Sequence, residues 1–253
     1  MNPLPEDARI ALEAAKARRF SYSVRVLSAP DSRPVVILGE THVKLQRAAE
    51  LGRRVVAAFP LRGVEGFQRK RVALGRTLGV LIEAPRLVLR AITGGLVQGS
   101  TIVEARALQT GVTFPLESTS PIPRGLHVGS IYLALYFGTF FLAMFSQLLP
   151  GPLRDLRRAL VPLAIFFNAH FLALPFAIAL RRHSWSWMIH PFVAILTLRD
   201  PHLAQGTVDM LAQHPNEPCA VLVMGRAHGP GVQRILIEEH GFQTGTPLES
   251  PSR

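Results

Sequence analysis

Cysteine and lysine are scarce in this 253-residue sequence, and each shortage restricts what the chain can be. Cys219 is the single cysteine, so no disulfide can form within the chain, and we expect it to be a small core residue of a strand. Lysine occurs only at Lys16, Lys44 and Lys70, which leaves arginine to supply most of a net charge of +11. No zinc-finger, RRM or helix-turn-helix pattern accompanies this charge, so we expect no nucleic-acid partner.

Two long apolar stretches without any Asp, Glu, Lys or Arg occupy residues 126–149 and 159–180. Each is about as long as the ~20 residues that an α-helix needs to cross the hydrocarbon of a bilayer. A short polar loop containing Arg154, Arg157 and Arg158 joins them. The pattern predicts a two-helix transmembrane hairpin, with the lipid bilayer as a partner. A pair of buried helices in a soluble core is the alternative.

A two-span hairpin returns the chain to the side of the membrane that it left. Residues 1–123 and 199–253 can then form one domain, while residues 124–198 contain the hairpin and an interfacial segment. Residues 1–20 lack the apolar stretch of a signal peptide, so we expect an integral membrane protein whose globular domain is cytosolic. The positive charge then suits anionic lipid headgroups.

A few polar and aromatic residues in the apolar stretches are expected at particular positions relative to the membrane. Asn168 and His170 fall near the middle of the second span, where polar groups are costly and are either functional or hydrogen-bonded to the other span. Residues 188–198 are apolar but too short to cross. They are expected at the interface, anchored by Trp185 and Trp187, or packed as a core helix.

The pattern Gly-x-x-His occurs twice, each time directly after a short apolar run. Residues 35–38 lead into Gly39-Glu40-Thr41-His42, and residues 220–224 lead into Gly225-Arg226-Ala227-His228. Such runs are typical of strands buried on both faces, and we expect each glycine to allow a tight turn. Each histidine then lies at the carboxyl edge of a strand, where open α/β sheets bind ligands.

Strand-like runs alternate with amphipathic segments of helical period on both sides of the hairpin. The alternation predicts an α/β fold, a mixed sheet flanked by helices and interrupted by the transmembrane hairpin. The strand candidates are residues 21–27, 35–38, 61–64, 112–116 and 220–224, and the helix candidates are residues 45–59, 101–111, 200–215 and 232–239.

This order of motifs resembles the TraB/PrgY family, which is related to the Tiki and GumN-type proteins. The similar pieces are Gly39-x-x-His42, Val64-Glu65, Ser100–Ala105, Arg199-Asp200 and Gly225-x-x-His228-Gly229. The resemblance implies a shared α/β fold and, in some members, a metal-dependent peptidase activity; other members shut down peptide signals. In this chain the membrane segments interrupt the domain rather than follow it, and an Asp-Arg pair usual after one strand is replaced by Glu117-Ser118.

His42, Glu65 and His228 are the expected ligands of a divalent metal ion, such as Zn, Mn or Co. Two imidazoles and one carboxylate leave an open position for water, as catalytic metal sites require. Glu40 is a candidate general base or a further ligand, and its alternative is a solvated turn residue. Glu65 is otherwise a surface carboxylate, and Gly39 and Gly225 shape the two turns.

Three further residues are candidates for the same site. We expect Arg199 and Asp200 either to form a structural ion pair beside the metal or to orient substrate, with Arg199 as the catalytic candidate of the two. Glu117, which ends another strand at what we expect to be the same edge, is a weaker candidate. These assignments lead to two hypotheses. The first is a membrane-anchored metal-dependent hydrolase, acting on peptides. The second is a non-catalytic membrane protein that captures a peptide or another small-molecule ligand.

Overall fold

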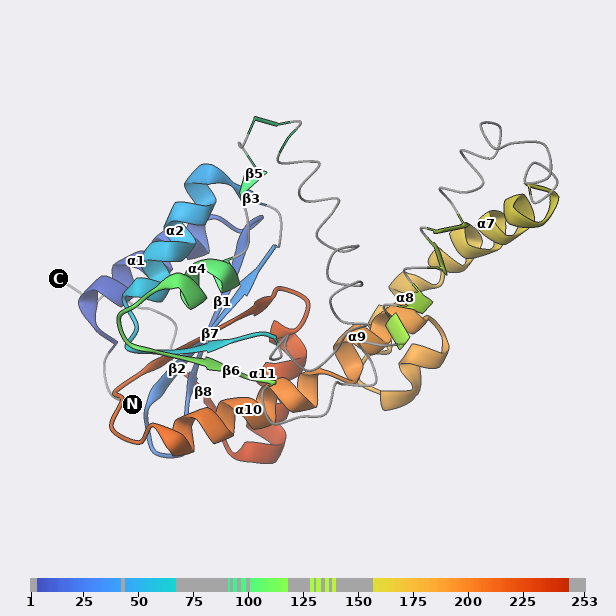
Figure 1. Cartoon of the computed structure of the whole chain (residues 1–253). Helices are drawn as coiled ribbons and strands as arrows, with labels where there is room; N and C mark the ends of the chain where they lie inside the picture. Colours follow the sequence, from blue (N-terminus) through green and yellow to red (C-terminus); the bar gives the residue numbers. More distant parts are fainter. Residues whose placement is uncertain are drawn as a thin grey trace. The chain divides into compact units, whose positions relative to one another are not determined.

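A computed structural model describes residues 4–41, 44–66, 91, 93–94, 97–98, 101–117, 128–129, 131–132, 135–136, 138–139 and 157–245. The chain divides into two compact units (Figure 1). Residues 1–120 and 200–253 form the first, here called the α/β unit. Residues 121–199 form the second, here called the apolar unit.

The α/β unit is built on a six-stranded sheet with the order β6-β4-β7-β2-β1-β8 (Figure 1). Its strands are β1 (Tyr22–Ser28), β2 (Pro34–Glu40), β4 (Leu61–Val64), β6 (Val112–Pro115), β7 (Ala220–Gly225) and β8 (Gln243–Thr244). Strands β6, β4, β7 and β2 run parallel, whereas β1 is antiparallel to both of its neighbours. The predicted mixed sheet is therefore confirmed. A separate two-stranded sheet pairs β3 (Lys44–Leu45) with β5 (Val97–Gln98).

The central strands are apolar along their whole length because both faces of the sheet are covered. Every residue of β2 and β7 is buried. Alternate side chains enter opposite cores: Ile37 and Leu222 face one side, and Leu38 and Val223 face the other. The first core is covered by α10 (Asp200–Gln213) and α11 (Gly229–His240), and the second by α1 (Glu6–Ala17), α2 (Gln46–Ala57) and α4 (Thr101–Ala107).

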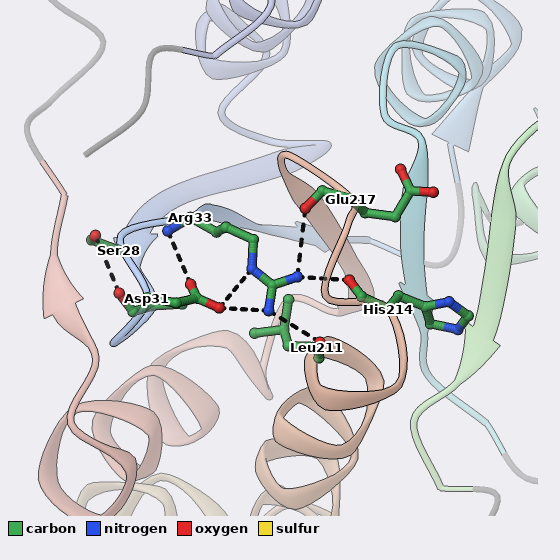
Figure 2. A network of polar contacts seen from close by, with 7 residues as sticks. Ser28, Asp31, Arg33, Leu211, His214 and Glu217 are labelled. Carbon is green, nitrogen blue, oxygen red and sulfur yellow. Dashed lines mark hydrogen bonds and ion pairs between the residues drawn. The ribbon is translucent and has the colours of Figure 1, made fainter.

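Arg33 ties the β1–β2 turn to the far end of α10 (Figure 2). Its guanidinium donates to Asp31 Oδ2 at 2.7 Å and to the carbonyls of Leu211 at 3.0 Å and His214 at 2.7 Å. The last carbonyls of a helix lack intrahelical partners and carry partial negative charge, so a buried arginine satisfies them and complements the helix dipole. This contact fixes the helix whose first residue, Asp200, belongs to the candidate site.

The apolar unit contains α7 (Arg157–Phe171), α8 (Leu174–Ala179), η3 (Ser184–Met188), η4 (Pro191–Val193) and α9 (Ala194–Thr197). Within the described part of the chain, one helical stretch, Leu160–Ala179, is long and apolar enough to cross a membrane. It corresponds to the second predicted span. Most of the first, residues 126–149, lies outside the described residues, so the two-span hairpin stays a prediction. Within residues 188–198, a short helical segment begins at Pro191, whose missing N–H separates it from η3, and it buries Val193, Ala194 and Leu196.

Polar residues of α7 hydrogen-bond to tyrosines from the stretch predicted as the first span. Tyr132 Oη lies 2.7 Å from His170 Nδ1, and Tyr136 Oη donates to Asn168 Oδ1 at 3.2 Å. His170 Nε2 donates to the carbonyl of Ile189 at 2.8 Å, because a carbonyl oxygen can only accept. In the neutral imidazole Nδ1 then accepts from the Tyr132 hydroxyl. Of the two sequence-based alternatives for Asn168 and His170, the structure supports the pairing role.

Candidate functional site

Four parallel strands end at the same edge of the sheet, and each brings an acid or a histidine to it. Glu40 is the last residue of β2, Glu65 directly follows β4, Glu117 closely follows β6, and His228 follows β7. All four side chains are buried. Burying carboxylates is costly unless each receives hydrogen bonds, so their partners reveal how the edge is organised.

Glu65 is held by the backbone of the neighbouring strand. Its own N–H donates to the Val223 carbonyl at 2.8 Å, and its Oε2 accepts the N–H of Gly225 at 2.5 Å. Arg106 from α4 donates to the Glu65 carbonyl at 3.2 Å. These bonds leave Oε1 directed at His228, whose Nε2 lies 3.5 Å away. Glu65 is thus fixed in the site from both its main chain and its side chain.

His228 lies between two carboxylates. Its Nδ1 is 2.6 Å from Oδ1 of Asp200, the first residue of α10. An ionised carboxylate only accepts hydrogen bonds, so Nδ1 carries the proton and Nε2 is the atom that faces Glu65. Asp200, His228 and Glu65 therefore form a line of buried groups contributed by α10, the turn after β7 and the end of β4.

Gly231 makes the approach of α11 to Asp200 possible. A Cβ added at Gly231 would overlap Asp200 Oδ2, whereas one at Gly229, two residues earlier, would meet its nearest neighbour at an ordinary 3.6 Å. Any side chain at position 231 would displace the carboxylate that orients His228. Gly231 therefore belongs to the site. Sequence reasoning missed it, because it lies outside both Gly-x-x-His motifs.

Glu40 and Glu117 each accept a backbone N–H at the same edge. Glu40 Oε2 accepts from Thr101, the first residue of α4, at 2.8 Å. Glu117 Oε2 accepts from Gly66 at 3.0 Å, and Gly66 has a left-handed φ of 127° that favours glycine. Glu117 thereby fixes the turn after Glu65, so it acts as a positioning residue. The roles of Thr101 and Gly66 were not predicted, although a glycine directly after a strand-end glutamate was a usable signal.

The two motif glycines act differently from the sequence-based expectation. Gly39 and Gly225 are the next-to-last and last residues of their strands, and neither is among the glycines with positive φ. A tight turn does follow Gly225, where the His228 N–H donates to the Gly225 carbonyl at 2.9 Å, but neither glycine needs a left-handed φ. Gly39 instead provides room, since a Cβ there would overlap Ser23 Oγ and lie 3.1 Å from the Cα of Arg226. Gly225 contributes its N–H to Glu65.

Arg199 is buried, and its backbone N–H donates to the Leu196 carbonyl at 3.2 Å. Whether it pairs with Asp200 or contacts substrate stays a prediction, while Asp200 has His228 as a partner. His42 lies outside the described residues, so its place in the site also stays a prediction. The structure thus brings together Glu65, His228 and Asp200 from the predicted set.

The donor chemistry of the edge fits one divalent cation. Glu65 Oε1 and His228 Nε2 are 3.5 Å apart. Two ligands on one tetrahedral metal, each bonded at about 2.1 Å, lie about 3.4 Å from each other. Asp200 on Nδ1 supplies the outer hydrogen bond that metal-binding histidines generally make. Among the described residues no group of three or more His, Cys, Asp or Glu side chains is arranged as a metal site, so a complete set requires His42 or another ligand.

Comparison of the chain with family models, with curated proteins and with solved structures gave no significant match.

Proposed function

We propose that the protein is a membrane-anchored, metal-dependent hydrolase that acts on peptides, with its site at the carboxyl edge of the α/β unit. The observation that carries this proposal is the buried line of Asp200, His228 and Glu65, in which one imidazole nitrogen is held by a carboxylate and the other faces a second carboxylate at 3.5 Å. The resemblance to TraB/PrgY proteins supports the peptide substrate. The apolar stretch Leu160–Ala179 supports the membrane anchor.

Glu65 Oε1 and His228 Nε2 would hold the metal ion, with His42 as the proposed third ligand. A bound divalent metal in such a site polarises a carbonyl and lowers the pKa of water. The chain's own residues prepare this chemistry. Asp200 keeps the proton of His228 on Nδ1, and the Gly225 N–H fixes Glu65. Glu40, at the next strand end, is the proposed general base.

Metal analysis of the purified full chain tests this proposal. We expect about one divalent ion per chain in the wild type and loss of that ion in His228→Ala and in Glu65→Gln. His240→Ala is the matched control, because His240 ends the same helix that His228 begins and lies at the opposite end of α11. Equal metal content in all variants would contradict the proposal.

The glycine pair in α11 gives a finer test. Gly231→Ala should displace Asp200 and weaken metal affinity by about 10–100-fold, the usual effect of losing an outer-shell partner, while Gly229→Ala should leave affinity unchanged. Turnover of a broad peptide library should fall in parallel. Metal binding without turnover of any peptide would instead indicate the second hypothesis, capture of a peptide or small ligand.

A further inference from the structure

A cationic patch with one exposed aromatic side chain lies at the end of α1. It consists of Lys16, Arg18, Arg19, Phe20 and Arg226, all of which are exposed. Phe20 is 95% exposed, more than any other large apolar side chain in the described part of the chain. We call these five residues the Phe20 patch.

The patch is joined to the edge of the sheet that carries the candidate site. Arg226 Nη1 donates to the Arg19 carbonyl at 2.7 Å, and Thr41 Oγ1 donates to the Phe20 carbonyl at 2.8 Å. Arg226 directly follows Gly225, and its backbone N–H donates to the Glu40 carbonyl at 2.9 Å. The Phe20 patch therefore borders the carboxyl edge, and its Arg226 lies in the same turn as His228.

The positive charges of the patch are available to a partner. Three other arginines of the α/β unit have glutamate partners one helical turn away, namely Arg9 with Glu13, Arg54 with Glu50 and Arg234 with Glu238. Within the described residues, none of the ion pairs includes a cation of the Phe20 patch. Among the described residues, the patch thus combines positive charges outside the ion pairs with an apolar side chain that is almost fully exposed.

We propose that the Phe20 patch docks the α/β unit on an anionic lipid surface. Phe20 enters the boundary between headgroups and acyl chains, and the arginines bind lipid phosphates, which is how basic and aromatic side chains hold proteins at interfaces. The same chain contains a helix long enough to cross a bilayer, so such a surface is within its reach. Docking would turn the carboxyl edge of the sheet toward the headgroups. This inference does not depend on the proposed hydrolase activity.

The test uses the full chain in lipid nanodiscs and a polarity-sensitive fluorophore attached at Phe20→Cys. Asn216→Cys is the matched control, because Asn216 is also exposed but precedes β7 and so lies at the opposite edge of the sheet. The native Cys219 does not interfere, since it is 1% exposed and burial raises the pKa of its thiol to about 11. Spin-labelled lipids serve as quenchers of fluorophores that enter the bilayer.

We expect a blue shift and strong quenching at position 20 in discs of phosphatidylcholine with phosphatidylserine, little change in pure phosphatidylcholine, and no response at position 216. Replacing Arg18, Arg19 and Arg226 together by Gln should lower the docked-to-undocked ratio by about 100-fold, since each arginine near an anionic surface contributes about fivefold. Replacing Arg9, Arg54 and Arg234 by Gln instead removes the same amount of charge and should lower the docked-to-undocked ratio much less.

Three results would overturn the proposal: equal responses at positions 20 and 216, a response at position 20 that is independent of phosphatidylserine, or equal losses in the two triple-arginine variants. Binding of an acidic peptide to the patch, with position 20 unresponsive to lipid, would assign the patch to a different partner and would also overturn it.

Discussion

The two units of the chain treat polar and apolar groups in opposite ways. The α/β unit buries Glu40, Glu65, Glu117, Asp200 and His228, each with a hydrogen-bond partner, and its exposed large apolar side chains in the described residues are Ile10, Phe20 and Val103. The apolar unit exposes many large side chains along its helices: Ile131, Leu135, Leu163, Ile165, Phe166, Leu172, Phe176, Ile178, Trp185 and Met188.

The exposed apolar side chains of the second unit agree with the proposed membrane anchor. Exposed apolar surface of this amount is unusual in water, whereas lipid would stabilise it. In the α/β unit the buried charges are tolerable because backbone N–H groups and His228 meet them. The same comparison predicts that one substitution has different effects in the two units.

The largest effect is expected for a charge on the apolar surface. Phe166 and Val103 are both 60% exposed, and they lie on helices of different units. Phe166→Arg should cost about 2.5–3.5 kcal/mol of membrane insertion, because the charge enters hydrocarbon, whereas Val103→Arg should change folding stability by less than about 0.5 kcal/mol. Membrane insertion is measured by glycosylation mapping, and folding stability by denaturant unfolding. Similar small effects for both variants would remove the distinction between the two surfaces.

Close packing in the α/β unit predicts the next effect. A Cβ at Gly206 in α10 would overlap the backbone carbonyl of Leu116, which cannot move without shifting the end of β6. Gly206→Ala should therefore destabilise the protein by about 2–3 kcal/mol. Gly229→Ala, where the nearest atoms are at van der Waals distance, is the control and should be nearly neutral. Chemical denaturation of the two variants measures this difference. Equal denaturation midpoints would contradict the close contact between Gly206 and Leu116.

Tyr22 tests the hydrogen bonds buried in the same unit. Its hydroxyl donates to the Ala48 carbonyl at 2.6 Å and lies 3.2 Å from Thr101 Oγ1, close to Glu40. Tyr22→Phe should cost about 1 kcal/mol. Burial raises the pKa of Tyr22 from 10.0 to about 12. The folded state thus favours the neutral phenol. The resulting contribution to folding stability is complete below pH 10 and is lost as the pH rises toward 12.

Titration of Tyr22 by ultraviolet absorbance, with Tyr22→Phe as the reference, measures that pKa. Ionisation of position 22 near pH 10 in the folded protein would show that the hydroxyl is solvated and would refute its burial.

The smallest effect on stability is expected for Asp31, the exposed partner of Arg33. The hydrogen bond from Arg33 lowers the pKa of Asp31 below its usual 3.8. A carboxyl group whose pKa is lower in the folded state than in the unfolded state stabilises the fold at any pH above the unfolded-state pKa. This stabilisation is lost as the pH falls through the folded-state pKa. Because the Asp31 side chain is half exposed, Asp31→Asn should reduce stability at pH 7 by only a few tenths of a kcal/mol. The difference in unfolding free energy between wild type and variant should be smaller at pH 3 than at pH 7; an undiminished difference at pH 3 would contradict this account.

Hydrophobic pattern made the sheet predictable. The continuous apolar runs that became β2 and β7 needed both faces covered, and the helical segments between strands supplied that cover. Strand ends also placed Glu65, Glu117 and His228 on one edge before any contact was known. The pattern could not predict which residue is the hydrogen-bond partner of each strand-end side chain. Asp200 meets His228 because α10 and α11 pack side by side, which Gly231 permits.

The sequence alone determined where the five longer strands lie, which stretch is apolar enough to cross a bilayer, and which residues end those strands. These properties follow from local period and composition. Only the tertiary structure decided that His228 lies between two carboxylates, that Ser23 and Arg226 approach Gly39 closely, and that Arg226 bonds to the chain just after α1. Each depends on groups distant in sequence approaching within a few ångströms, and only the packing of the whole chain sets such distances.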